Sequence, residues 1–260
     1  MLSAVKQATR AVLLGSLVLG AGCSHTQKTP AEAKADTTRF VVVLLDKTAS
    51  VKDQNSVFVT ATNRVIKDLK PGDRFALAEI TGASASDFEF VVDKTLDKNP
   101  VYDPLTTNAS EYKDTVADLK TARAKEREDL VGEVQKELKR KPKFLQTDLF
   151  GAINTAGAAL SSWPGRKTLV ILSDMIEEDN HIRFNHVHWT PAVQAKTLAR
   201  VKKLGLIPTL KNTEIYVVGV RGPSLSVTQE IHAFWSEYFK EAGSPLLPSH
   251  YAHTLLDWAD

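Results

Sequence analysis

The stretch VVVLLDKTAS, residues 41–50, has five consecutive apolar residues followed by an acid and two hydroxyl side chains, Asp46, Thr48 and Ser50. An uninterrupted run of valine and leucine is typical of a β-strand that is buried on both faces, as in a parallel sheet covered by helices. The polar residues belong to the turn that leaves this strand. In open parallel sheets, ligands bind beyond the carboxyl ends of the strands. The stretch therefore predicts both a fold class and the position of a site.

Other apolar runs alternate with helical patterns along the chain. We expect strands at 40–45, 74–80, 167–173 and 214–220, an edge strand at 88–92, and helices at 54–69, 147–162, 192–203 and 226–241. This alternation predicts an α/β fold: a doubly wound, mostly parallel sheet with one antiparallel edge strand and helices on both faces.

Two further segments have oxygen-bearing side chains at the end of a predicted strand or at the start of a predicted helix. Ser173 and Asp174 stand at the end of the run at 167–173, and Thr147 and Asp148 open the helix expected at 147–162. We expect these residues to meet the first loop at one rim of the sheet. Hard divalent cations prefer oxygen ligands, and Mg²⁺ takes few protein groups while keeping several waters. The rim is therefore a candidate Mg²⁺ site.

These residues resemble the metal-ion-dependent adhesion site of the von Willebrand factor type A domain. That family places Asp-x-Ser-x-Ser after its first strand, a threonine in a later loop and an aspartate after its fourth strand. The segments LKPGDRFALAEI (69–80) and TDLFGAI (147–153) extend the resemblance, which covers residues 39–241. The matching residues in this chain are Asp46, Thr48, Ser50, Thr147 and Asp174.

The resemblance implies a Rossmann-like fold with Mg²⁺ or Mn²⁺ at the top rim of the sheet. The hydroxyls of Thr48, Ser50 and Thr147 would bind the ion directly, while Asp46 and Asp174 orient ligands or hold waters. Thr48 departs from the serine of the family, and its added methyl group changes the space around the ion. An ion with few bound carboxylates keeps positive charge and an open position, which accepts an acidic side chain of a protein partner. The expected function is recognition without catalysis.

A phosphotransfer enzyme is the alternative interpretation. DKTAS also resembles the DKTGT motif of P-type ATPases, in the haloacid dehalogenase superfamily, whose aspartate is phosphorylated. Asp46 would then be the nucleophile, Ser173 the later hydroxyl, and Lys167 or Lys202 the required lysine. Thr147 distinguishes the two interpretations, because only the adhesion-type site uses its hydroxyl. A third possibility is a domain of the same fold whose site has lost its metal.

The first 22 residues predict export. Lys6 and Arg10 precede the apolar stretch AVLLGSLVLGAG (11–22), which is too short to span a bilayer. LVLGAGCS (17–24) resembles the lipobox of bacterial lipoproteins, although Gly20 stands where that family usually has leucine. Cys23 would then carry the lipid, and Ser24 would favour the outer membrane. An ordinary signal peptide, giving a periplasmic protein, is the alternative.

Residues 23–38 are small and polar, and predict a flexible tether before a domain at 39–260. The whole chain has 33 basic and 31 acidic residues, and residues 1–22 contribute two of the basic ones. The remaining chain is therefore neutral and offers no electrostatic reason to bind nucleic acid, so contact with a membrane would come through the lipid alone. With Cys23 as the only cysteine, no internal disulfide is possible.

A charged segment at about 107–143 is expected to insert into the domain. Residues 111–141 carry charges of both signs at helical spacing, which predicts a long or broken helix standing partly in solvent, or a docking arm. The loop at 175–191 contains three histidines that could bind zinc, although their spacing matches no closed zinc pattern, and otherwise shapes the partner surface. These histidines are His181, His186 and His188. An apolar stripe at helical spacing is expected in the core: Ile231, Phe234, Trp235, Tyr238 and Phe239.

Overall fold

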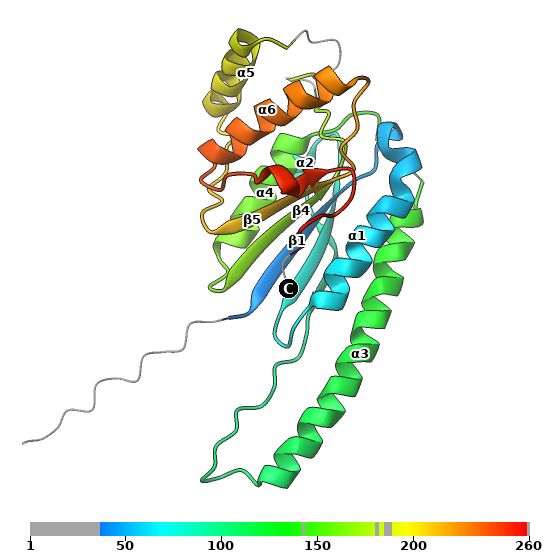
Figure 1. Ribbon diagram of the computed structural model, residues 1–260, viewed down its shortest axis with the longest axis vertical. Helices are drawn as coiled ribbons and strands as arrows, with labels where there is room; N and C mark the ends of the chain where they lie inside the picture. The colour runs from blue at the N-terminus through cyan, green and yellow to red at the C-terminus, as the bar shows by residue number, and fades with distance from the viewer. Residues whose placement is uncertain (1–36, 142–143, 180–181, 185–188, 259–260) are drawn as a thin grey trace, which may run out of the picture. The chain divides into compact units, whose positions relative to one another are not determined.

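A six-stranded sheet with the order β3-β2-β1-β4-β5-β6 forms the centre of the domain in the computed structural model of the chain (Figure 1). The structure describes residues 37–141, 144–179, 182–184 and 189–258. Among the described strands, β3 alone runs antiparallel to its neighbour. This confirms the predicted doubly wound, mostly parallel sheet. The strands are Arg39–Asp46 (β1), Arg74–Ile80 (β2), Phe90–Thr95 (β3), Arg166–Leu172 (β4), Thr213–Val218 (β5) and Tyr251–Ala252 (β6).

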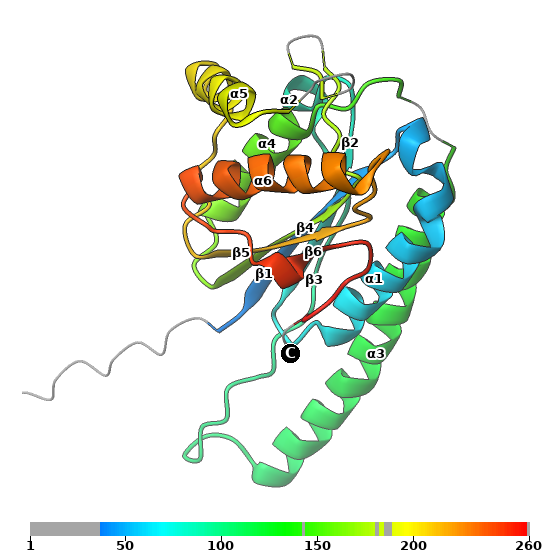
Figure 2. The same ribbon diagram turned by 45° about the horizontal axis from the view of Figure 1, so that its top comes forward.

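Helices cover both faces of the sheet (Figures 1 and 2). One face packs against α1 and α3, and the opposite face against α4, α5 and α6. The long helices are Asn55–Asp68 (α1), Ala109–Lys139 (α3), Leu149–Ser161 (α4), Pro191–Lys203 (α5) and Leu225–Glu241 (α6). Short elements are the 3₁₀ helices Ala49–Gln54 (η1) and Pro248–His250 (η2) and the helix Ser84–Asp87 (α2).

Alternate side chains of β1 enter two separate hydrophobic cores. Val42 and Leu44 pack in the core that contains α4 and α6, whereas Val41, Val43 and Leu45 pack in the core that contains α1 and α3. Each of these side chains is at most 1% exposed, and full burial of a valine or leucine contributes about 1.5–3 kcal/mol. Burial on both faces explains why the strand has only apolar residues between Arg39 and Asp46.

The last part of the chain adds an element that the sequence does not predict. β6, only two residues long, pairs in parallel with β5, although we expected the tail only to pack against the domain. β3 begins at Phe90 rather than at 88, because α2 and its turn occupy the connection from β2. The apolar stripe of α6 is buried as predicted, with Trp235 and Phe239 wholly inaccessible.

The charged insertion is one unbroken helix, α3, whose second half is docked on α1. Leu130, Val134 and Leu138 are buried in the shared core, and Asn108 caps the start of the helix by accepting hydrogen bonds from two backbone amides. The first half of the helix is mostly exposed, with the buried Arg123 donating to the carbonyl of Asp97 at 2.7 Å. The prediction of a helix standing partly in solvent is therefore confirmed.

Some predictions concern residues outside the described part of the chain. These are the signal peptide at 1–22, Cys23, most of the tether, and the three histidines of the loop after β4. Within the described part, no helix has the length and apolar character needed to cross a membrane.

Candidate metal centre

Asp46, the last residue of β1, is held by three hydrogen bonds at the rim of the sheet. Its Oδ1 accepts from the backbone amide of Thr48 at 2.9 Å and from the Thr48 hydroxyl at 2.7 Å, and its Oδ2 accepts from the Ser173 hydroxyl at 2.7 Å. The residue is 2% exposed, and this burial raises the pKa of its carboxyl group. Asp46 therefore joins the ends of β1 and β4, which are neighbouring strands.

The two hydroxyls that follow Asp46 point into the same space. Thr48 Oγ1 lies 3.0 Å from Ser50 Oγ. Two oxygens that bind one Mg²⁺ at right angles, each at 2.0–2.1 Å, would be about 2.9 Å apart. The pair therefore already has the spacing of adjacent ligands in an octahedral shell.

Asp174, after β4, completes the acidic side of the site. Its Oδ1 accepts from the amide of Ile176 at 3.0 Å, and the Ser50 side chain is near enough to lower its pKa. Burial and the nearby charge of Asp46 raise the pKa of Asp174 to about 7. Two buried carboxylates that repel each other are stabilised by a proton or by a cation between them.

A strained turn fixes the position of Asp174. Met175 is fully buried and has φ 66°, in the left-handed region that costs a residue with a side chain about 1–3 kcal/mol. Its amide donates to the Ser173 hydroxyl at 3.0 Å, and its carbonyl accepts from Trp235 Nε1 at 3.0 Å. Packing of α6 therefore holds the turn in a conformation that the local sequence disfavours.

Thr147 reaches the rim from a third segment, just before α4. Its amide and carbonyl both pair with Glu178 in the loop after β4, each at 3.0 Å. Its side chain lines a cavity of about 510 Å³ together with Thr48 and Ser50. Within the described residues, the Thr147 hydroxyl makes no hydrogen bond and so remains available to a ligand.

All five residues predicted from the sequence thus lie at one rim, in three loops. The donor set is three hydroxyls and two carboxylates, which fits a hard cation. A hydroxyl has a single proton, and when Thr48 donates it to Asp46 the oxygen lone pairs remain for a metal ion. The residues present therefore fit Mg²⁺ or Mn²⁺, with Thr48, Ser50 and Thr147 as candidate direct ligands.

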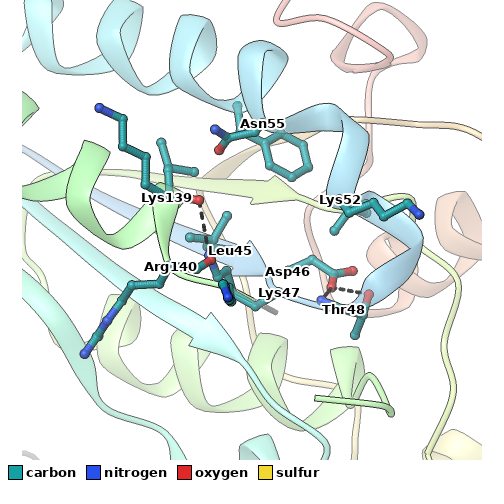
Figure 3. Close-up of a pocket in the computed structure, with 12 residues that line it drawn as sticks. Leu45, Asp46, Lys47, Thr48, Lys52, Asn55, Lys139 and Arg140 are labelled. Carbon is teal, nitrogen blue, oxygen red and sulfur yellow. Dashed lines mark hydrogen bonds between the residues drawn. The ribbon is translucent and has the colours of Figure 1, made fainter. Parts of the chain in front are cut away.

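Lys47 has a role that the sequence does not reveal. Its side chain is buried, and its ammonium group donates to the carbonyls of Glu137 at 2.9 Å and Leu138 at 3.2 Å, and to that of Arg140. Figure 3 shows Lys47 directed toward the end of α3, while Asp46 and Thr48 face each other. A cation at the carboxyl end of a helix also suits the helix dipole. The loop that carries the ligands is therefore tied to the end of the charged insertion.

The lysines needed for phosphotransfer are not near Asp46. Lys167 is paired with Phe40 at the opposite end of β1, six residues from Asp46 and therefore roughly 20 Å away along the strand. Lys202, at the end of α5, is exposed and bound to Glu241 at 2.9 Å. Neither of the two lysines proposed for phosphotransfer can therefore assist Asp46 as a nucleophile.

The strand order and the rim residues together describe a von Willebrand factor A-like fold. No protein-family model matches the sequence, and a search of curated proteins gives no match. Solved structures with similar folds include a pilus adhesin, SpaC, from Lactobacillus rhamnosus GG, with 11% identity and a TM-score of 0.45. Others are the ArnB paralog VWA2 from Sulfolobus acidocaldarius, with 12% and 0.40, and a von Willebrand factor type A structure from Catenulispora acidiphila, with 13% and 0.36.

These matches cover 85%, 78% and 80% of this chain, but only 28%, 40% and 42% of the matched chains. The chain therefore spans less than half the length of each of them. At these TM-scores the fold assignment depends on the strand order and the register of this chain, and the function must be argued from its own residues.

Proposed function

We propose that the domain is a metal-dependent protein-binding module of the bacterial cell envelope. A Mg²⁺ or Mn²⁺ ion at the rim is held by the hydroxyls of Thr48, Ser50 and Thr147 and oriented by Asp46 and Asp174. The ion supplies a positively charged coordination position for an acidic side chain of a partner protein. The observation that carries the proposal is that a hydroxyl pair 3.0 Å apart and Thr147 line one cavity, with the buried carboxylates of Asp46 and Asp174 beside the hydroxyl pair.

Charge and exposure favour recognition over chemistry at this site. Asp46 is 2% exposed and accepts three hydrogen bonds, so its carboxylate is neither accessible nor free to attack a phosphorus atom. The cavity beside the hydroxyls is lined by apolar side chains, among them Ile176 and Val227. A partner can therefore place apolar surface next to the acidic residue that reaches the ion.

The envelope location is part of the proposal and comes from the N-terminal segment. A lipid on Cys23, followed by a polar tether at 23–38, would hold the domain at the membrane, and the first strand of the domain begins after the tether, at Arg39. Anchoring would place the binding rim in the periplasm, on the inner side of the outer membrane, where divalent cations and acidic partner proteins are accessible.

Calorimetric titration of the purified protein with Mg²⁺ and Mn²⁺ tests the metal site. We expect binding by the wild type and strong loss in both Asp46→Ala and Thr147→Val. Binding that survives Thr147→Val but not Asp46→Ala, together with a beryllofluoride adduct on Asp46, would support phosphotransfer instead. Capture of a partner from envelope extracts that is abolished by a chelator and by Thr147→Val then tests recognition; capture that is indifferent to both contradicts it.

A further inference from the structure

A second group of carboxylates lies beside the rim and is not used by the proposed metal site. Asp148, Glu177 and Asp179 come from the turn before α4 and from the loop after β4, and are 8%, 0% and 7% exposed. One carboxylate oxygen from each lies within 4.8 Å of those of the other two. Burial of three acidic groups so close together costs free energy unless a proton or a cation compensates their charge.

Backbone amides hold all three of these carboxylates, and Asp179 Oδ1 accepts from the amide of Ile182. Asp148 accepts from the amides of Gly151 at 2.7 Å and Ala85 at 3.2 Å, and Glu177 Oε2 accepts from the amide of Leu149 at 2.8 Å. The bonds from Leu149 and Gly151 satisfy amides in the first turn of α4, the bond from Ala85 comes from α2, and all three orient the carboxylates. They do not use every oxygen of the group.

The second oxygen of Glu177 is the observation that points to a ligand. Glu177 is completely buried, yet its Oε1 has no hydrogen-bond partner among the described residues. Tyr238, whose hydroxyl is close enough to be affected by the charge of Glu177, donates its proton to the carbonyl of Leu206 at 2.8 Å instead. An unpaired carboxylate oxygen in the interior costs about 1–3 kcal/mol or more, and Glu177 has one carboxylate oxygen within 4.8 Å of an oxygen of each of the other two acids.

We propose that Asp148, Glu177 and Asp179 form a second, buried cation site that takes Ca²⁺. Oxygens bound to one Ca²⁺ at 2.3–2.6 Å lie at most about 4.6–5.2 Å apart, so three oxygens within 4.8 Å of one another can share one such ion. Ca²⁺ also accepts several carboxylates and irregular geometry, whereas Mg²⁺ demands a near-ideal octahedron. This site shares no ligand with the rim and does not depend on the proposed function.

The site has a structural consequence for the loop after β4. The same loop carries Asp174 and the backbone of Glu178 that pairs with Thr147. A cation at this site would be bound by Glu177 and Asp179 from the loop after β4 and by Asp148 from the turn before α4. It would therefore cross-link the two segments that carry Asp174 and Thr147 to the rim. Ca²⁺ is therefore expected to stabilise the folded domain even when the rim site is disabled.

Calcium titration in a rim-disabled background separates the two sites. In the full chain with Asp46→Asn and Thr147→Val, we expect one Ca²⁺ per molecule by calorimetry. We also expect a rise in Tm of about 5–10 °C when Ca²⁺ is at 100 times its Kd. Adding Glu177→Gln should abolish both effects, because the amide keeps an oxygen for Leu149 but loses the charge. Glu178→Gln, the neighbouring acid outside the group, should leave both effects unchanged.

Each outcome decides between explanations. Loss of Ca²⁺ binding in the rim-disabled protein, with binding to the wild type intact, overturns the second site and leaves the proposed function standing. One Ca²⁺ site in both proteins that disappears with Glu177→Gln supports the second site and means that Ca²⁺ does not bind at the rim, whose Mg²⁺ and Mn²⁺ binding is tested by its own titration. If Ca²⁺ has no effect, while Glu177→Gln raises Tm at pH 8, the acids share protons and the inference is wrong. Should Glu177→Gln fail to fold, Asp179→Asn serves as the second variant with the same expected results.

Discussion

Replacement of Thr147 by valine separates ion binding from folding at the rim. Valine has nearly the same shape as threonine, and the Thr147 hydroxyl has no hydrogen bond within the described residues. Both backbone bonds of Thr147 to Glu178 remain possible in the variant. Replacing a polar group by an apolar group of the same shape changes the free energy of unfolding little when no hydrogen bond is lost. We therefore expect the free energy of unfolding of the metal-free protein to change by less than about 0.5 kcal/mol.

The affinity for Mg²⁺ should change far more. Loss of one direct hydroxyl ligand, with the other ligands in place, is expected to weaken binding by about 10- to 100-fold, in the range measured for groups that support metal ligands. This corresponds to about 1.4–2.8 kcal/mol. The structural reason is that, among the described residues of the turn before α4, only Thr147 and the apolar Leu145 line the cavity shared with Thr48 and Ser50.

Calorimetry and urea unfolding, carried out on the same preparations, measure the two quantities. Thr168→Val is the matched control, because Thr168 is a buried threonine of β4 near the opposite end of the sheet. We expect Thr168→Val to leave the Kd for Mg²⁺ unchanged. The reasoning is refuted if Thr147→Val binds Mg²⁺ as tightly as the wild type, or if its weaker binding merely follows a large loss of stability.

Three further predictions follow from the contacts. The free energy of unfolding of the metal-free protein should fall as the pH rises from about 4 to 7, because the pKa of Asp174 is raised to about 7 in the folded state, which keeps its proton after the unfolded state has lost it. Urea midpoints measured across this range should show that Asp174→Asn reduces the slope of stability against pH, by at most about 1.4 kcal/mol per pH unit. A slope that Asp174→Asn leaves unchanged contradicts the assignment. Lys47→Met should cost about 2–3 kcal/mol, because it leaves carbonyls at the end of α3 without their charged donor, whereas the exposed Lys52→Met should cost almost nothing in the same unfolding assay. Leu130→Ala should cost about 2–5 kcal/mol by undocking α3 from α1, while Leu105→Ala, at a position 93% exposed, should not change the unfolding midpoint.

The parts of the fold that the sequence predicts are those in which burial leaves a periodic pattern. β1 can be predicted because both of its faces are covered, which leaves a run of apolar residues. α3 can be predicted because its charges follow helical spacing over 31 residues. β6 has two residues, too few for any pattern, and its pairing with β5 depends on where η2 places the tail. The start of β3 depends on α2, a helix of four residues that no local signal separates from a turn.

The site divides in a similar way. Asp46, Thr48 and Ser50 are predictable because they follow a buried strand at fixed spacing, and the resemblance supplies Thr147 and Asp174. The roles of Lys47 and Glu177 are tertiary: Lys47 meets carbonyls some 90 residues away in the chain, and Glu177 caps a helix 28 residues before it. A single sequence contains no signal for such contacts, because a lysine or glutamate in a polar loop is expected to be exposed to solvent.

Anomalous diffraction at the manganese edge, from crystals of the full chain grown with Mn²⁺, tests the central claim directly. We predict a peak within about 2.0–2.3 Å of the hydroxyl oxygens of Thr48, Ser50 and Thr147, with Asp46 and Asp174 in hydrogen-bonding contact with its ligands and one position filled by water or by an acidic side chain. A map without a peak at the rim, with the Thr48 and Ser50 hydroxyls still bonded only to each other and to the two aspartates, would contradict it.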